Sequence, residues 1–354
     1  MPAFPRHPRK ILVRSTNWIG DAVMSTPAVR TIRDNFPESE ISILVHPWVS
    51  DVFRYSPRVD RVLLYEKKGR HRGLRGMWHL AQELRAEEFD CAILLQNAFE
   101  AGLITWLAGI PARGGYTTDG RGMLLTHGVR KPLDLVKKHE VTYYQRIMVG
   151  LGMKPAPNDP ELFISGEQIS AAKERLCTLT GLEPGAAPLI GFNPGAAFGP
   201  AKRWPAERFA ELATMLCRQT DARIVIFGSG ADQPTARAII AGAGQAADRI
   251  HDLCGATSLI EAMALIGECD VFVTNDSGLM HVAAALQTPL VAIFGSTDHI
   301  ATGPYCDNAI VIRKPLPCSP CKKAQCPEKH FRCMTLISTE EVFEAVLRQL
   351  EANR

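Results

Sequence analysis

The sequence predicts an α/β protein made of two Rossmann-like, doubly wound domains. Short apolar runs alternate with helical patterns along most of the chain. The alternation stops at a segment rich in proline and glycine, Gly150–Glu167, and then restarts. With 354 residues, the chain is long enough for two domains of ordinary size. Nearly continuous apolar strands separated by helices are typical of a parallel sheet that is covered on both faces.

The first half of the chain contains four runs rich in β-branched and apolar residues. They predict strands at Ile11–Ser15, Ile41–His46, Arg61–Tyr65 and Cys91–Gln96. The amphipathic patterns between these runs predict helices at Asp21–Asn35, Leu74–Glu88 and Phe99–Gly109. This order of elements is that of a parallel sheet with crossover helices.

The second half repeats the pattern. Strands are expected at Pro188–Asn193, Ala222–Gly228, Asp270–Asn275 and Pro289–Gly295. Helices are expected at Ala206–Gln219, Asp232–Ala243, Leu259–Gly267, Gly278–Leu286 and Thr339–Leu350. We therefore expect domains at residues 1–160 and 161–335, and a C-terminal helix in 336–354 that could pack back toward the first domain. Ligands of open α/β sheets bind beyond the carboxyl ends of the strands, so an active site is expected in a cleft between the facing domains.

Bulk composition limits the class of protein. No apolar run approaches the roughly 20 residues that span a bilayer, and the first ten residues hold no apolar core of a signal peptide, so a cytoplasmic location is expected. Residues 1–160 hold 23 Lys and Arg against 16 Asp and Glu, whereas the remainder holds 17 against 21. The first half is more suited to an anionic partner, although a well-solvated surface would show the same imbalance. Basic residues are not interleaved with aromatic ones, so nucleic acid is not expected.

A loop after the first strand of the second half has the composition of a phosphate site. The apolar strand ends at Phe192, and a run of Gly, Ala and Pro follows before Lys202 and an amphipathic helix. Small residues let a ligand approach the backbone closely, and a lysine beside them can pair with phosphate. The alternative is a tight turn with a solvated Lys–Arg pair.

A second loop in this half ends a strand and starts a helix. Asp276 is expected to be the N-cap of the helix Ser277–Leu286, and a glycine follows. The unpaired N–H groups of such a helix end bind anions. The alternatives are simple capping by Asp276 and a core role for His281. Lys202 and this helix end could converge on one diphosphate.

The first strand of the chain ends in a turn with an acid. The stretch Thr16–Val29 has one glycine, Gly20, followed by Asp21, and it lacks the G-x-G-x-x-G pattern of dinucleotide-binding proteins. The missing pattern argues against a dehydrogenase, and a carboxylate here would also repel phosphate. At the carboxyl end of a strand it could instead act as a general base for an acceptor hydroxyl. The alternative is that Asp21 only caps the helix Ala22–Asn35.

Two further segments carry concentrated polar chemistry. The run Tyr65–Gly76 holds five cations that could bind an anionic acceptor, with a solvated loop as the alternative; they are Lys67, Lys68, Arg70, Arg72 and Arg75. Lys137 and Lys138 could contribute.

Near the C-terminus, four cysteines follow the spacing C-x₂-C-x₄-C-x₆-C; they are Cys318, Cys321, Cys326 and Cys333. Metal sites commonly begin with C-x₂-C, so a structural metal, reduced thiols and disulfides are the alternatives for this segment.

Three stretches carry a resemblance to a known family: Asn17–Arg33, Asn193–Pro205 and Thr274–Leu286. With them, and over nearly the whole chain, the sequence resembles the ADP-heptose:lipopolysaccharide heptosyltransferases, which have the GT-B fold. The resemblance is greatest to heptosyltransferases of type II. It implies an inverting transfer of L-glycero-D-manno-heptose from ADP-heptose to the first heptose of the lipopolysaccharide inner core, with no catalytic metal or cofactor.

The resemblance also assigns roles to residues. Lys202 matches the lysine that binds the donor diphosphate, Asp21 matches the general base, and Asp232 roughly matches an acidic residue near the ribose. The other positions expected around the donor are Asn193, Gly255, Thr257, Ser258, Leu259, Asp276, Ser277, Gly278 and His281. The positions expected around the acceptor are Asn17, Lys67, Lys68, Arg70 and Arg72. The implied acceptor, lipid A–Kdo–heptose, would bring the protein into transient contact with the inner face of the inner membrane.

The sequence is also compatible with other functions. Heptosyltransferases I and III, or another ADP-sugar transferase of the family, would share these motifs. A non-catalytic protein that binds ADP-sugars would bind without turnover, and Asp21 would then be only a cap. A sugar-nucleotide epimerase would act without an acceptor.

Overall fold

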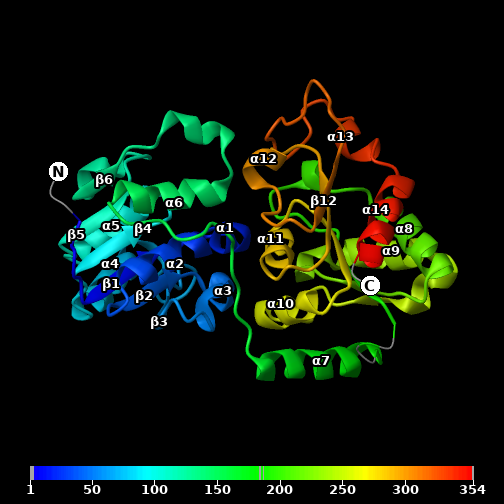
Figure 1. Cartoon of the computed structure of the whole chain (residues 1–354), viewed down its shortest axis with the longest axis horizontal. Coiled ribbons are helices and arrows are strands. Elements are labelled where there is room, and N and C mark those ends of the chain that lie inside the picture. Colours follow the sequence, from blue (N-terminus) through cyan, green and yellow to red (C-terminus); the bar gives the residue numbers. More distant parts are fainter. Residues whose placement is uncertain (1–3, 183–184, 186, 353–354) are drawn as a thin grey trace. The chain divides into compact units, whose positions relative to one another are not determined.

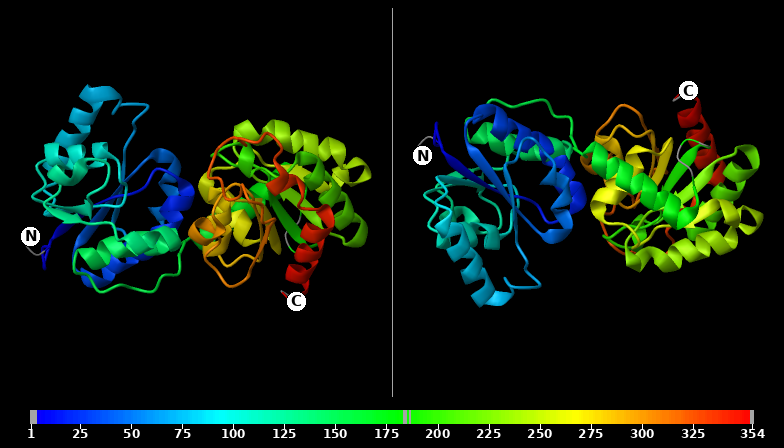
Figure 2. Two further views of the ribbon diagram at one scale, coloured as in Figure 1. Left: turned by 90° about the horizontal axis from the view of Figure 1, so that it is seen from above. Right: turned by 90° about the horizontal axis from the view of Figure 1, so that it is seen from below.

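The computed structural model describes residues 4–182, 185 and 187–352. The chain divides into two compact units, Met1–Phe163 and Ile164–Arg354. Each unit contains a six-stranded parallel sheet with helices on both faces (Figures 1 and 2). These two Rossmann-like sheets confirm the predicted fold class.

The first unit has the strand order β3-β2-β1-β4-β5-β6. Its strands are β1 (Lys10–Arg14), β2 (Glu40–Val45), β3 (Arg61–Leu64), β4 (Cys91–Leu94), β5 (Ala112–Tyr116) and β6 (His127–Val129). Its α-helices are α1 (Ile19–Met24), α2 (Thr26–Asn35), α3 (Asp51–Arg54), α4 (Gly73–Ala86), α5 (Phe99–Leu107) and α6 (Glu140–Gly150). The order of strands reverses between β1 and β4, which is where ligands of such sheets bind.

The second unit has the order β12-β11-β10-β7-β8-β9, and its order reverses between β7 and β10. Its strands are β7 (Leu189–Asn193), β8 (Arg223–Ile226), β9 (Ile250–Asp252), β10 (Val271–Asn275), β11 (Leu290–Phe294) and β12 (Ala309–Arg313). Its α-helices are α7 (Gly166–Thr180), α8 (Ala206–Gln219), α9 (Gln233–Gly242), α10 (Leu259–Gly267), α11 (Gly278–Ala285), α12 (His299–Thr302), α13 (Arg332–Thr335) and α14 (Thr339–Ala352). Both loops singled out as a phosphate site follow the two strands that flank the reversal.

Helix α14 belongs to the core of the second unit. It packs against α8, β10 and β11. Its side chains Val342, Phe343 and Val346 are buried in one cluster with Phe209 of α8 and Ile293 of β11. Within the described residues of this unit, the last helix thus covers the same sheet face as α8 and α9, instead of forming a segment of its own.

The first predicted helix is divided at Ser25 into α1 and α2. Pro27 has no N–H to donate to the carbonyl of Val23, so the helical hydrogen-bond ladder is interrupted there. A hydroxyl group replaces the missing donor, because Thr26 Oγ1 donates to the Val23 carbonyl over 2.8 Å. Ser25 Oγ adds a second bond to the Ala22 carbonyl over 2.8 Å, beside that of its own N–H. The interruption leaves α1 as a short helix that carries Asp21.

The sequence analysis missed β5 because two of its five residues are glycine. Both glycines are required by close packing. A Cβ at Gly114 would lie 2.8 Å from the side chain of Leu151, and a Cβ at Gly115 would lie 3.0 Å from the carbonyl oxygen of Leu94. Tertiary contacts here override the low intrinsic strand propensity of glycine.

Across the described ranges, no helix combines the length and the apolar character that crossing a membrane requires.

Candidate active site

The carboxyl ends of β7 and β10 are joined by a polar network. Asn193 ends β7, and its Oδ1 accepts hydrogen bonds from Thr274 Oγ1 at 3.1 Å and Ser277 Oγ at 2.6 Å. Asn275 ends β10; its Oδ1 accepts from the Trp204 N–H at 3.0 Å, and its Nδ2 donates to the Pro194 carbonyl at 2.7 Å. The two strand ends therefore hold the loop of residues 194–204 and the start of α11 in one fixed arrangement.

Lys202 and Asp276 meet within this network. The Lys202 Nζ lies 2.7 Å from Asp276 Oδ2, and their side chains are only 14% and 5% exposed. Thr297 Oγ1, which follows β11, donates to the same carboxylate oxygen over 2.5 Å. Phe198 lies beneath the ammonium group, with its ring centroid 5.1 Å from Nζ. The convergence of Lys202 with the β10–α11 turn, which the sequence predicts, is present in the structure.

The predicted N-cap role of Asp276 is wrong. The N-cap of α11 is Ser277, whose Oγ accepts from the Met280 N–H at 3.3 Å. The Asp276 carboxylate instead binds Lys202 and Thr297, so its charge is directed at the cation and not at the helix backbone. Gly278 is the first residue of α11, and His281 is buried one turn further on.

The remaining predicted donor residues form a second group in the segments that follow β8 and β9. Asp232 Oδ2 accepts from the N–H and the Oγ of Ser229 at 2.9 and 2.8 Å, as part of a capping box. The Asp232 carboxylate lies against Gly195, where a Cβ would be 2.7 Å from Oδ1. Gly255 has a φ of +71° and approaches the backbone of Gly230. Asp232 thus lies beside the β7 loop that leads to Lys202.

The predicted adenine loop ends at the start of α10. Ser258 is the N-cap of α10, and its N–H and Oγ donate to Glu261 at 2.7 and 2.8 Å. Leu259 is the first residue of the helix, and Thr257 precedes the cap as a half-buried side chain. Because capping fully accounts for the Ser258 side chain, the loop would offer mainly its backbone to a ligand.

Asp21 lies in the first turn of α1, directly after the switch-point strand β1. The N-cap residue of α1 is Trp18, so the alternative that Asp21 caps this helix is wrong. Asp21 is half-buried and is hydrogen-bonded by the hydroxyl group of Tyr144 from α6. Burial, and then the charge of Asp21, raises the pKa of Tyr144 well above its ordinary value, so this hydroxyl stays protonated and acts as the donor. No sequence pattern marked Tyr144, because its partner lies far away in the chain.

Replacing Tyr144 with phenylalanine should lower kcat about tenfold, because a hydrogen bond to a charged group is worth roughly 1.5–3 kcal/mol and this one orients the carboxylate. The acid limb of the kcat/KM profile should move to higher pH, since the bond that stabilises the charged carboxylate is gone. Pre-steady-state and steady-state kinetics over pH 5–9 measure both effects. Tyr143→Phe is the matched control, because the neighbouring Tyr143 hydroxyl binds Asn97. Equal profiles for both variants would show that Tyr144 does not act on Asp21.

A buried cation supports the loop that follows β1. Arg14 is 2% exposed, and its guanidinium group donates to the Ser15 carbonyl at 2.7 Å and to Asn17 Oδ1 at 3.0 Å. Burial lowers its pKa to about 10, against the opposing effect of the Tyr65 and Glu100 side chains. Arg14 therefore remains charged at neutral pH and fixes the orientation of Asn17, the residue predicted to contact the acceptor.

The basic run is largely paired with side chains of its own unit. Lys67 Nζ lies 2.5 Å from Glu100, and Arg70 lies 3.3 Å from Glu66 and 3.4 Å from Glu83. The Lys68 ammonium group lies 5.8 Å from the centroid of the Trp48 ring. The remaining predicted cations of this run, Arg72 and Arg75, are exposed.

The Glu100 carboxylate links this run to the acid stability of the first unit. Burial disfavours its charge, but hydrogen bonds from Lys67 and Tyr65 outweigh burial and lower the pKa of Glu100. A carboxyl group whose pKa is lower in the folded state contributes stability above its unfolded pKa, and this contribution is lost as the pH falls through the folded pKa.

Glu100→Gln should lower the free energy of unfolding by less than about 1 kcal/mol at pH 7, because solvent screens the pair of Glu100 and Lys67. Urea denaturation should show this cost shrinking below about pH 4.3. Glu38→Gln, at an exposed turn, is the control; a cost that persists at low pH would contradict this explanation.

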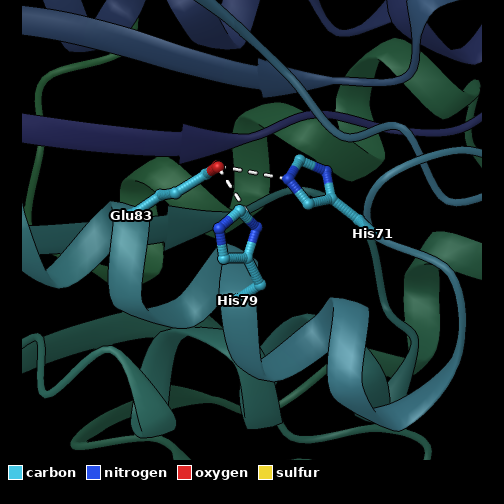
Figure 3. Close-up of side chains that lie close together, drawn as sticks. All are labelled: His71, His79 and Glu83. Atoms are coloured by element: carbon cyan, nitrogen blue, oxygen red, sulfur yellow. Dashed lines mark hydrogen bonds and ion pairs between the residues drawn. The ribbon is translucent and has the colours of Figure 1, made fainter.

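A group of two histidines and a glutamate lies beside the basic run. Among the described residues, His71, His79 and Glu83 are the group of three whose candidate ligand atoms lie mutually within 4.8 Å (Figure 3). His71 Nδ1 accepts from the Glu66 N–H at 3.0 Å, and burial lowers the pKa of His71, so its neutral ring carries the proton on Nε2. That nitrogen then donates to Glu83 at 3.1 Å. These two hydrogen bonds of His71 fix the loop onto α4.

The two Rossmann-like units are those of the GT-B class. The second unit has Lys202 and the N-terminus of α11 at its switch point, and the first unit has Asp21 at its switch point. Together, these features define a glycosyltransferase. The family profile of glycosyltransferase family 9 (heptosyltransferase) matches residues 77–332. The chain belongs to this family.

Individual relatives match nearly the whole chain. Lipopolysaccharide heptosyltransferase 2 of Escherichia coli K12 is 34% identical over 361 aligned residues, which cover 97% of this chain and 100% of that protein. The solved structure of the E. coli ADP-heptose LPS heptosyltransferase II superposes with a TM-score of 0.81 at 32% identity, covering 97% and 99% of the two chains. A family 9 glycosyltransferase from Veillonella parvula superposes with a TM-score of 0.89 at 27% identity, covering 99% and 100%.

Proposed function

We propose that this enzyme transfers L-glycero-D-manno-heptose from ADP-heptose to the first heptose of the lipopolysaccharide inner core. The observation that carries the proposal is the pairing of Lys202 with Asp276 directly before α11, whose N-cap residue Ser277 is hydrogen-bonded to Asn193 at the end of β7. A cation beside a helix N-terminus suits the diphosphate of a nucleotide sugar. Its agreement with the near full-length similarity to heptosyltransferase 2 favours this donor over others.

In the proposed reaction, Asp21 accepts the proton of the acceptor 3-hydroxyl group. The oxygen attacks the anomeric carbon from the face opposite ADP, the bond from that carbon to the diphosphate oxygen breaks, and the configuration inverts. Lys202 and the N–H groups at the start of α11 stabilise the charge that develops on the leaving diphosphate. Neither step needs a metal ion or a cofactor to balance.

In the structure, the Asp276 carboxylate is paired with the ammonium group of Lys202, which the diphosphate would need as its own partner. We propose that ADP-heptose exchanges this ion pair for a phosphate contact, while Thr297 continues to hold the carboxylate. Asp276 would then face the heptose hydroxyl groups as an acceptor of hydrogen bonds. The ion pair thereby holds Lys202 in place before the donor arrives.

The acceptor is proposed to bind the first unit through Asn17 and the exposed part of the basic run. Arg72 and Arg75 are exposed there, and so are the apolar side chains Leu74 and Trp78, at 81% and 52%. Cations beside exposed apolar and aromatic side chains suit the interface of an anionic membrane. This surface supports the predicted transient contact with the inner membrane, and with it a location at that membrane's cytoplasmic face.

A transfer assay with ADP-heptose and defined truncated lipopolysaccharide acceptors tests the proposal. Product is expected with an acceptor that ends in one heptose and not with one that ends in Kdo. Transfer to the Kdo-terminated acceptor would identify heptosyltransferase 1 activity, and transfer only to a longer core would identify a type 3 enzyme. Tight ADP-heptose binding without transfer to any acceptor would favour a non-catalytic binding protein, and donor isomerisation without an acceptor would favour an epimerase.

A further inference from the structure

Four cysteines of the second unit surround one small cavity. Three of them, Cys318, Cys321 and Cys326, lie between β12 and α13, and Cys333 lies in α13 (Figure 1). Together they line a cavity of about 10 Å³, the space of about one water molecule or metal ion. No disulfide joins any of these four described cysteines. The C-x₂-C-x₄-C-x₆-C spacing thus brings all four thiols to one place.

A serine hydroxyl group points to a ligand in the same cavity. Ser296, which follows β11, is 1% exposed and also lines the cavity. Its Oγ is buried and has no hydrogen-bond partner among the described residues. A buried hydroxyl group without a partner is costly, and a metal-bound thiolate in the same cavity would accept a hydrogen bond from it.

A divalent cation at the centre of these four thiols would be bound by their thiolate forms, because the thiolate is the form of cysteine that binds metal.

We propose that Cys318, Cys321, Cys326 and Cys333 bind a single thiophilic metal ion, Zn²⁺ or iron, as a structural tetrathiolate site. Tetrahedral coordination by four sulfurs is typical of these metals. No three of the four described thiols lie mutually within 4.8 Å, so their side chains must rotate inward to reach Zn–S distances of about 2.3 Å. Binding therefore tightens the whole segment.

The tightened segment would support the loop of Lys202. The Ala201 N–H donates to the Ala324 carbonyl at 3.1 Å, and Gly199 lies so close that a Cβ there would be 2.4 Å from the same oxygen. On its other side the segment is tied to the loop after β11, through the Lys322 N–H and the Ser296 carbonyl at 2.7 Å. The metal would thus hold the loop that carries Lys202 in place without contacting the donor.

The metal content of the full chain tests the site. Protein purified anaerobically without chelator should contain about one equivalent of zinc or iron by plasma mass spectrometry. Iron in four thiolates is coloured when oxidised and zinc is colourless, so the absorption spectrum separates the two. Exchange into Co²⁺ should give intense thiolate charge-transfer bands. Three results would overturn the proposal. The first is a metal content below 0.1 equivalents (~tenfold below stoichiometric), and the second is failure to take up either metal under reducing conditions. The third is the presence of disulfides among these cysteines.

Three variants test the ligands and the link to the donor loop. Cys326→Ser should lose the metal, whereas Cys306→Ser, a half-buried cysteine outside the cluster, should retain it. Ser296→Ala should fold, retain the metal and bind it about 10- to 100-fold more weakly, as loss of a supporting hydrogen bond predicts. Chelation of the parent should weaken ADP binding several-fold by calorimetry. Equal metal affinity of Ser296→Ala and the parent would contradict the role of Ser296, and unchanged ADP affinity would contradict the link to Lys202.

Discussion

Replacing Asp21 with asparagine is expected to lower kcat by about 10²–10⁴-fold, the usual contribution of a general base. The substitution preserves the shape of the side chain, and its amide oxygen can still accept the hydrogen bond of Tyr144. What it removes is the ability to take a proton from the acceptor hydroxyl group. The affinity for ADP should not change, because the contacts proposed for the diphosphate all lie in the second unit.

Steady-state transfer kinetics, calorimetry with ADP and thermal unfolding together measure these expectations. Asp34→Asn is a suitable control, since Asp34 lies in the neighbouring helix α2, where its exposed carboxylate pairs with Arg58 at 3.8 Å. If kcat of the Asp21 variant stays within a few-fold of the parent, another group must accept the proton. If the variant loses ADP binding as well, Asp21 acts on the fold and not on the chemistry.

The fold could be predicted largely from local pattern. The strands of the central sheets are nearly continuous apolar runs, and α8 and α10 begin and end at the predicted residues. Prediction failed where tertiary contacts decide the local structure, as in β5, whose glycines fit against Leu151 and the Leu94 carbonyl. It also failed at Ser25, where the effect of Pro27 depends on whether a hydroxyl group, here that of Thr26, can replace the lost donor.

The candidate site could be predicted in its residues but not in its pairings. Sequence places Lys202 and Asp276 after switch-point strands, but their direct contact depends on how two loops meet. The residues that hold the site, such as Tyr144 and Thr297, lie on elements distant in sequence and carry no motif. Their side chains become informative only when the fold brings them to a carboxylate.

Replacing Lys202 with methionine is expected to weaken ADP binding about 10- to 100-fold, since a charged hydrogen bond contributes roughly 1.5–3 kcal/mol. It should also lower kcat by about 10²–10³-fold, because the charge on the leaving diphosphate grows in the transition state. Methionine keeps the length and the apolar part of the side chain above Phe198. Calorimetry with ADP and transfer kinetics measure the two effects separately. Unchanged values of both would exclude Lys202 from the site.

The ion pair complicates this experiment and also makes it informative. Loss of Lys202 leaves the buried Asp276 carboxylate with Thr297 alone, and breaking a buried pair on one side commonly costs about 3–5 kcal/mol of stability. The double variant Lys202→Met/Asp276→Asn removes both charges and should recover stability without recovering ADP binding. Asp276→Asn alone frees the ammonium group, so it should bind ADP at least as tightly as the parent while transferring heptose poorly. If Asp276→Asn instead weakened ADP binding as much as Lys202→Met, the pair would act as one structural unit, and the exchange of the carboxylate for the diphosphate would be wrong.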